Sequence, residues 1–237
     1  MSPLLAERQK PLEDPLVYLP CSRIAEYKKG QTIYNHGQQD PRLYLIVEGA
    51  VKISRLSKAG TQVVFDVYHR DEFFGEFAFL CDAARGDAEA VQNTKVMSWT
   101  ALEIEDFILN RPVLGIAFMQ ILANRSFEFT ERIESFACDT ITRRLAGALI
   151  RFCERLGEAT EAGDGSYRML PLTHELLGQY VGTSREIMTH YMNQFRRQGY
   201  VTYSRRELIV FPERLKKWLN QNLKIAINAA PLSLPAR

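Results

Sequence analysis

Residues 172–211 read LTHELLGQYVGTSREIMTHYMNQFRRQGYVTYSRRELIVF, and the two glycines in the first half of this stretch are informative. Gly178 and Gly182 stand four residues apart, which lets one short helix pack closely on the next through a tight turn. Thr183 and Glu186 have the spacing of a capping box, so a second helix is predicted to begin there. The pattern is typical of a helix-turn-helix.

The second helix is predicted to have one buried and one exposed face. Ile187, Tyr191 and Phe195 recur every four residues and predict a buried stripe. The remaining positions carry side chains that can hydrogen-bond base edges and phosphates, namely Arg185, Glu186, Thr189, His190 and Asn193. Exposed Arg-Glu pairs are also common on ordinary surfaces, so a protein-binding domain is the alternative.

A β-hairpin is predicted directly after Gly199. The runs YVTY and LIVF flank the segment SRRE, whose turn carries Arg205 and Arg206. Two short helices followed by a basic hairpin are typical of a winged helix-turn-helix, in which the hairpin is the wing.

Charge is distributed unevenly along the chain. From Leu170 to the last residue there are 10 Lys and Arg against 4 Asp and Glu, which is a net charge of +6. The whole chain has 30 Lys and Arg and 28 Asp and Glu. The rest of the chain therefore has 20 basic and 24 acidic residues, which is a net charge of −4. A basic C-terminal segment is expected of a module that contacts phosphates.

The segment GQYVGTSRE, followed by a helix and a basic wing, resembles the DNA-binding domain of the Crp/Fnr regulators, the catabolite activator family. Upstream, YLIVEGAVKIS and FFGEFAFL resemble the cyclic-nucleotide-binding β-roll that precedes this domain in the family. The resemblance implies an α+β fold with an N-terminal cyclic-nucleotide-binding-like β-roll, a long dimerisation helix and a C-terminal winged helix-turn-helix.

Length and composition are those of an ordinary globular protein. The 237 residues exceed the usual size of one domain, and 46% are apolar while 24% are charged. No apolar run approaches the roughly 20 residues of a membrane span, so a cytoplasmic protein without a membrane partner is expected. The four cysteines are Cys21, Cys81, Cys138 and Cys153. They form no C-x-x-C pair, so no metal site is predicted.

Short strands separated by glycine turns are predicted from about Ile24 to Trp99. Apolar runs such as LYLIVEGAVKIS and VVFDVY alternate there with turn segments such as KAGTQ. Such regular spacing of short strands indicates an all-β barrel or sandwich.

The resemblance implies an effector pocket in the β-roll. In the family the stretch after a Gly-Glu pair folds over the nucleotide. The Glu accepts a hydrogen bond from a ribose hydroxyl, and an Arg about eleven residues after the Gly pairs with the phosphate. Here Arg85 lies ten residues after Gly75 and is followed by Gly86 and Asp87, where cyclic AMP binders carry Ser-Ala. The family's adenine-contacting Thr-Ser pair falls on Glu128 and Phe129. The pocket candidates are therefore Gly75, Glu76, Arg85, Glu128 and Phe129, and the departures speak against cyclic AMP.

A long helix is predicted to begin at Pro112. One apolar stripe along it has the spacing of a heptad seam and consists of Met119, Leu122, Ser126, Phe129, Ile133 and Phe136. A second stripe contains Ile116, Ala117, Ile121 and Phe127. One stripe can cover the β-roll while the other contacts an identical helix, so a homodimer is favoured over a two-faced core helix within one chain. The resemblance implies the same dimer.

The expected boundaries follow from these patterns. They are an N-terminal arm over residues 1–21, the sensor β-roll over 22–110, the dimerisation helix over 111–138, the winged helix-turn-helix over 139–222 and a C-terminal tail over 223–237. Asp139 is expected to cap the helix that follows it. Pro212 is expected to begin a last helix that ends at about Asn222.

The expected function is that of a homodimeric, sequence-specific transcription regulator. Two recognition helices would enter successive major grooves of double-stranded DNA, about 34 Å apart, and read a palindromic site. By resemblance Arg185 and Glu186 contact bases, and Thr189 and His190 are further candidates for base reading. The candidates for phosphate contacts are Thr183 and Ser184, beside the free amides of the helix start, and Arg205 and Arg206 on the wing. His190 stands where the family carries a second base-reading Arg, so the half-site is expected to differ from the family's. An activator would also contact RNA polymerase.

The input signal stays open, and no cofactor is identified. A nucleotide-type effector, a cyclic dinucleotide and DNA binding without an effector are all compatible with the sequence. An iron–sulfur cluster needs clustered thiolates, of which the N-terminal region offers only Cys21, whereas His36 and His69 leave haem as an alternative.

An alternative function is a nucleotide-binding regulatory module that acts on a protein partner without binding DNA. An enzyme is not expected, because no carboxylate pair, Ser-His-Asp set, Cys-His pair or metal-ligand set has the spacing that such chemistry requires.

Overall fold

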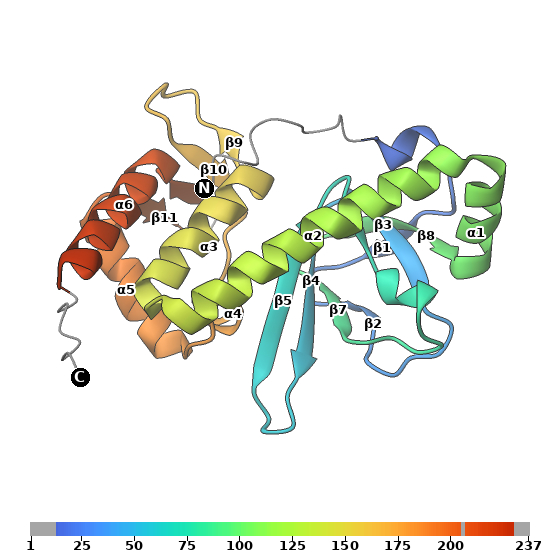
Figure 1. Cartoon of the computed structure of the whole chain (residues 1–237), viewed down its shortest axis with the longest axis horizontal. Coiled ribbons are helices and arrows are strands. Elements are labelled where there is room, and N and C mark those ends of the chain that lie inside the picture. Colours follow the sequence, from blue (N-terminus) through green and yellow to red (C-terminus); the bar gives the residue numbers. More distant parts are fainter. Residues whose placement is uncertain (1–12, 205–206, 230–237) are drawn as a thin grey trace, which may run out of the picture. The chain divides into compact units, whose positions relative to one another are not determined.

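The structure is a computed structural model that describes residues 13–204 and 207–229, with the backbone alone for residues 222–229 (Figure 1). The chain forms two compact units. Of the described residues, 13–55 together with Phe65–Glu134 form the first unit, and Leu56–Val64 together with those from Ser135 to Ala229 form the second. The first unit is built mainly of strands and the second mainly of helices, which confirms the predicted α+β class.

Short antiparallel strands build the β-roll, as predicted. They are β1 (Ala25–Tyr27), β2 (Thr32–Tyr34), β3 (Arg42–Glu48), β4 (Ala50–Leu56), β5 (Gln62–His69), β6 (Phe73–Phe74), β7 (Asp87–Ala90) and β8 (Thr94–Thr100). One sheet has the order β1-β8-β3-β6 and the other has the order β2-β7-β4-β5. Two short 3-10 helices, η2 (Pro15–Val17) and η3 (Glu76–Phe79), also belong to this part of the chain.

Two apolar clusters stabilise the β-roll. The first contains the buried residues Ile33, Tyr34, Tyr44, Ile46, Val51, Tyr68, Phe74, Ala84, Ala88 and Val96. The second joins β3 and β8 to two helices and contains Leu43, Leu45, Phe73, Trp99, Ile104, Leu114 and Phe118. Those helices are α1 (Ala101–Asn110), which the sequence analysis did not predict, and α2 (Pro112–Cys138).

Helix α2 begins at Pro112 as predicted, but its inward face differs from the predicted second stripe. Leu114, Ala117 and Phe118 are buried, whereas Ile116 and Phe127 are exposed. The buried positions follow a spacing of three and four, which presents one face of the helix to the β-roll. Ala117 and Ile121 of the predicted second stripe do pack inward, whereas Ile116 and Phe127 lie off that face and were wrongly included in the stripe.

The second unit contains the predicted winged helix-turn-helix (Figure 1). Its elements are α3 (Ile141–Leu156), β9 (Glu158–Ala159), β10 (Tyr167–Met169), α4 (His174–Val181), α5 (Arg185–Arg197), β11 (Val201–Tyr203), β12 (Leu208–Val210) and α6 (Pro212–Ala229). The small sheet has the order β11-β12-β10-β9. Residues 205 and 206, which carry the two wing arginines of the sequence analysis, lie outside the described residues.

Two details at helix ends differ from the expectation. The hydroxyl of Thr140, and not the carboxylate of Asp139, caps α3 by accepting a hydrogen bond from the Arg143 amide. Asp139 is engaged elsewhere, because Nε of the Arg143 side chain donates to its carboxylate at 2.6 Å and the Ser135 hydroxyl donates at 2.9 Å. Helix α6 begins at Pro212 as predicted and continues past Asn222 to Ala229.

Within the described residues, every helix is too short or too polar to cross a membrane. The same residues include no group of three or more His, Cys, Asp or Glu side chains arranged to hold a metal ion.

Candidate functional site

The turn between α4 and α5 requires glycine at two positions. Gly182 ends α4 in the left-handed region, with φ of 78°, which glycine adopts at little cost. At Gly178 a β-carbon would lie 2.9 Å from the carbonyl oxygen of Thr183, so a larger residue would push the two helices apart. The close helix packing predicted from these glycines is confirmed.

Helix α5 begins one residue later than predicted. The Thr183 amide still donates to the Gly178 carbonyl at 2.9 Å, so Thr183 belongs to the turn that ends α4. Ser184 is the N-cap, and its hydroxyl accepts a hydrogen bond from the Ile187 amide at 3.3 Å. The predicted capping box of Thr183 and Glu186 is therefore wrong.

The buried face of α5 also differs from the predicted stripe. Met188, Met192 and Phe195 are fully buried, and the Phe195 ring packs edge-on against Tyr200 and Trp218, with ring centroids 5.6 Å apart in both pairs. Ile187 is 42% exposed and Tyr191 is only partly buried. The stripe keeps a helical spacing but begins one residue later than the sequence analysis predicted.

The predicted base-reading side chains begin in the first turn of α5. Arg185, Glu186 and His190 are exposed, and Arg185 forms no ion pair with a described carboxylate. Hydrogen bonds from the backbone amide of Glu186 and from the Ser184 hydroxyl hold the pKa of the Glu186 carboxyl below its usual value. Glu186 is therefore an ionised acceptor, and Arg185 is a donor beside it.

Two further polar residues of α5 bond within the unit. The Thr189 hydroxyl donates to the Arg185 carbonyl at 2.8 Å and lies 3.0 Å from Nδ1 of His174. Asn193 accepts a hydrogen bond from the Tyr203 hydroxyl of β11 at 2.9 Å. His174, which the sequence analysis did not single out, packs edge-on against the Tyr203 ring with centroids 5.3 Å apart. These contacts link the start of α4, helix α5 and strand β11.

The candidate phosphate contacts lie at the N-terminus of α5. Ser184 is exposed at the N-cap, and Thr183 immediately precedes it. Free backbone amides and the positive end of the helix dipole make a helix start suitable for an anion. Arg205 and Arg206, proposed for the same role, lie outside the described residues.

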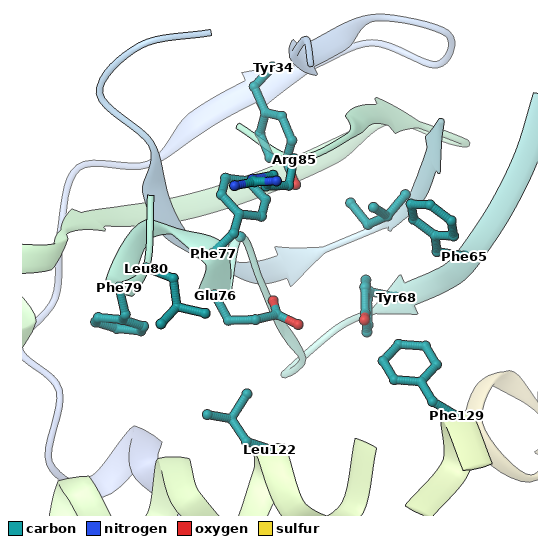
Figure 2. A pocket seen from close by; sticks show the side chains of 12 residues that line it. Tyr34, Phe65, Tyr68, Glu76, Phe77, Phe79, Leu80, Arg85, Leu122 and Phe129 are labelled. Carbon is teal, nitrogen blue, oxygen red and sulfur yellow. The ribbon is translucent and has the colours of Figure 1, made fainter. Parts of the chain in front are cut away.

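The first unit holds the candidate effector pocket, a cavity of about 440 Å³ (Figure 2). Four of the five predicted pocket residues line it: Gly75, Glu76, Arg85 and Phe129. A β-carbon at Gly75 would lie 2.3 Å from the Arg42 carbonyl oxygen, and the residue has φ of 88°, so this turn requires glycine.

The fifth predicted residue does not line the pocket. Glu128 accepts a hydrogen bond from the side-chain amide of Asn124, one turn back on α2, at 2.9 Å. Asp87 also lies outside the lining, and its carboxylate accepts the backbone amide of His36 at 2.8 Å. Consecutive residues of a helix point in different directions, which is why Phe129 lines the pocket and Glu128 does not.

Arg125 is the main residue that the sequence analysis missed. Its guanidinium donates to the Glu76 carboxylate at 2.8 Å and to the Phe73 carbonyl, and it lies over the Tyr68 ring at 4.5 Å. Leu122, Arg125 and Phe129 follow a spacing of three and four, so they share one face of α2. The sequence signal that could have identified Arg125 is its place as a basic residue on the same helix face as the apolar Leu122 and Phe129.

The predicted dimerisation stripe is exposed along α2. Relative exposure is 63% for Met119, 69% for Ile133 and 40% for Phe136. Leu122 and Phe129 are also more than two-fifths exposed, and both line the pocket. The apolar stripe and the pocket therefore share two side chains.

Known protein families match both the β-roll and the helix-turn-helix of this chain. Residues 24–111 match the family model described as a cyclic nucleotide-binding domain, and residues 143–218 match the one described as a Crp-like helix-turn-helix domain. The chain is 25% identical over 193 residues to the global nitrogen regulator of Synechococcus elongatus, covering 80% of this chain and 86% of that protein. It is 23% identical over 186 residues to the CRP-like cAMP-activated global transcriptional regulator of Mycobacterium tuberculosis, covering 78% and 82%.

The fold itself recurs among solved structures. FixK2 from Bradyrhizobium japonicum superposes with a TM-score of 0.73 at 22% identity, over 84% of this chain and 97% of that one. The regulator CLP of Xanthomonas campestris, described as responsive to c-di-GMP, superposes with a TM-score of 0.67 at 17% identity, over 80% and 94%.

Proposed function

Because the chain belongs to the Crp/Fnr family of transcription regulators, we propose that it is a cytoplasmic homodimer that reads a palindromic DNA site. Helix α5 of each subunit enters the major groove, and the two half-sites lie about 34 Å apart, one turn of the duplex. A small effector in the β-roll pocket controls this binding, and that effector is not cyclic AMP.

The main support for this proposal is that α5 has one buried face and one exposed polar face. Met188, Met192 and Phe195 anchor one face in the core, while Arg185, Glu186 and His190 are exposed. Arg185 can donate two hydrogen bonds to guanine, and the ionised Glu186 can accept one from cytosine. His190 offers a smaller donor than an arginine, which supports a half-site that differs from the family's at one position.

The exposed stripe of α2 supports the dimer. A row of exposed, mainly apolar side chains on a 27-residue helix is the kind of surface that a second copy buries. Dimerisation would place two copies of α5 in the symmetric arrangement that a palindrome requires. If the regulator activates transcription, it also contacts RNA polymerase.

Three features of the pocket support an effector other than cyclic AMP. The Glu76 carboxylate is already paired with Arg125 at 2.8 Å, so it is a weaker acceptor for a ribose hydroxyl. The position that contacts adenine in the family carries the apolar ring of Phe129. Arg85 stands one residue out of the family's phosphate position.

The test is a selection of binding sites from a random duplex library with purified protein, first without added ligand and then with a panel of nucleotides. We expect a two-fold palindrome with half-sites one helical turn apart. If no sequence is enriched and the protein is monomeric, the chain is instead a regulatory module that acts on a protein partner.

Two variants separate base recognition from phosphate contact. Arg185→Ala is expected to cost about 1–3 kcal/mol and to relax base preference at one position of each half-site. Arg205→Ala is expected to weaken binding to all sequences alike and to make the salt dependence shallower. A uniform loss in both variants would contradict the assignment of Arg185 to base reading.

A further inference from the structure

The pocket of the β-roll is walled by aromatic rings. Its aromatic lining residues are Tyr34, Phe65, Tyr68, Phe77, Phe79 and Phe129, and the aliphatic ones include Ile53, Leu80 and Leu122. A cavity of about 440 Å³ is within the usual size range of small-molecule sites. Aromatic walls favour a flat aromatic ligand, because rings gain stacking and edge-to-face contacts in addition to the burial of apolar area.

The charges on the pocket wall favour an anion. Of the two charged lining residues, Glu76 is paired with Arg125. Arg85 forms no ion pair with any carboxylate of the described chain; its Nε donates to the Cys81 sulfur at 3.3 Å. The terminal amino groups of its guanidinium are suited to a carboxylate, which they can hold with two parallel hydrogen bonds.

A second donor lies in the buried part of the wall. Tyr34 is 3% exposed, and among the residues that the structure describes its hydroxyl has no hydrogen-bond partner. Burial, together with the nearby Glu76, raises the pKa of Tyr34, so the hydroxyl keeps its proton and can donate. A buried hydroxyl without a partner is costly, and a ligand oxygen placed there would remove that cost.

The pocket has two distinct sides (Figure 2). In this view Tyr34, Phe77 and Arg85 lie opposite Leu122 and Phe129, which project from α2. The Tyr34 and Phe77 rings are in edge-to-face contact with centroids 5.4 Å apart. The polar donors thus belong to one side, and apolar side chains form the other.

We propose that the pocket binds a small aromatic carboxylate. The carboxylate accepts hydrogen bonds from the Tyr34 hydroxyl and the Arg85 guanidinium, and the aromatic ring lies toward Tyr68, Leu122 and Phe129. This assignment rests on the proposed function, in which the β-roll holds the effector, and it names the chemical class of that effector. A ligand that contacts Leu122 and Phe129 touches the same α2 face as the exposed stripe.

The test is calorimetric titration of the full-length protein with phenylacetate, indole-3-acetate, the two corresponding amides and cyclic AMP. We expect at least one acid to bind, and its amide to bind at least about tenfold more weakly, because the amide lacks the charge that Arg85 recognises. The proposal is overturned if neither acid binds, or if an acid and its amide bind equally.

Tyr34→Phe separates a ligand contact from a structural role. The variant keeps the ring and removes only the hydroxyl, so the ligand-free protein should be as stable as the wild type or more stable. Affinity for the acid should nevertheless fall by about tenfold. Tyr27→Phe is the matched control, because Tyr27 belongs to the same unit and does not line this pocket. Unchanged affinity in Tyr34→Phe would overturn the assignment.

Arg85→Gln should weaken binding of the acid and leave binding of the amide nearly unchanged. Arg111→Gln is its control, since Arg111 is exposed at the end of α1 and outside the pocket lining. Site selection on the same protein distinguishes the two proposals. A palindrome without acid binding defeats the effector class alone, whereas acid binding without a palindrome, in selections run both with and without the acid, supports the effector class and defeats the DNA-reading proposal.

Discussion

Arg125 is held by three different contacts, and each depends on its guanidinium. The group pairs with Glu76, donates to the Phe73 carbonyl and lies 4.5 Å over the Tyr68 ring, and the side chain is only 11% exposed. Arg125→Met should lower the free energy of unfolding by about 1–3 kcal/mol, because it leaves a partly buried carboxylate without its partner. Urea denaturation followed by circular dichroism measures this change.

Lys95→Met is the matched control for that substitution. Lys95 pairs with Glu48 at 2.9 Å, a similar distance, but both side chains are exposed and the pair is screened by water. Its loss should be much smaller than the loss in Arg125→Met. Equal effects in the two variants would mean that burial of the Arg125 pair contributes nothing to stability.

His174 makes stability depend on pH. Partial burial, and secondarily the charge of Arg185, lowers the pKa of its imidazole below the usual 6.5. The folded state therefore binds fewer protons than the unfolded state once the pH falls below about 6.5, so stability should decrease as the solution is acidified through that value. Thermal denaturation at pH 7.5 and pH 5.5 is expected to show a lower midpoint at the lower pH.

Substitution separates His174 from the carboxylates that also titrate on acidification. His174→Gln should reduce the difference between the two midpoints, while His190→Gln, which changes an exposed histidine of the same motif, should preserve it. If His174→Gln shows the same difference as the wild type, this histidine does not carry the pH dependence.

At the scale of elements, the helix-turn-helix depends on how closely α4 and α5 approach. A β-carbon at Gly178 would lie 2.9 Å from the Thr183 carbonyl oxygen, which is backbone and cannot move aside cheaply. Gly178→Ala should therefore destabilise the protein by about 1–3 kcal/mol, as overpacked substitutions do. Chemical denaturation measures the loss, and DNA affinity should fall with it.

Gly147→Ala is the control, because Gly147 lies within α3 and a β-carbon there would meet no atom within 4 Å. This substitution should stabilise the protein by about 0.5–1 kcal/mol, since alanine favours the helix more than glycine does. Destabilisation of similar size by both alanines would contradict the packing argument for Gly178.

Helix periodicity in the sequence located α5 but not its buried face. The stripe predicted from Ile187 and Tyr191 has helical spacing, and so does the observed stripe of Met188 and Met192. Both sets are apolar, so pattern alone could not separate them. The end of α4 determines which set is buried. The Thr183 amide donates to the Gly178 carbonyl, so α5 begins one residue later than predicted.

At the scale of the whole molecule, the proposed dimer is tested on the α2 stripe. Ile133 is 69% exposed in the single chain, so Ile133→Asp should leave the folded subunit intact. In a dimer the carboxylate introduced by this substitution would be buried opposite the same carboxylate of the second subunit. We therefore expect the dissociation constant of the dimer to rise by about 100-fold or more. Sedimentation velocity over a range of protein concentrations measures this change.

Leu102→Asp is the control for a general effect of replacing an exposed apolar side chain by a charge. Leu102 is 76% exposed on α1, away from the stripe in sequence and on a different helix. It should leave the dissociation constant unchanged. A monomeric wild type, or equal effects of the two substitutions, would refute dimerisation through this stripe.

The sequence by itself determined the order of the parts: a β-roll, a long helix from Pro112 and a winged helix-turn-helix with Gly178 and Gly182 at its turn. These features depend on residues close together in the chain, whose periodicity and turn chemistry are local. Tertiary structure alone decided that Arg125 pairs with Glu76, that Glu128 turns away from the pocket and that the Tyr34 hydroxyl is buried without a partner. Such contacts join residues far apart in sequence, and packing of the whole unit sets which side chains meet.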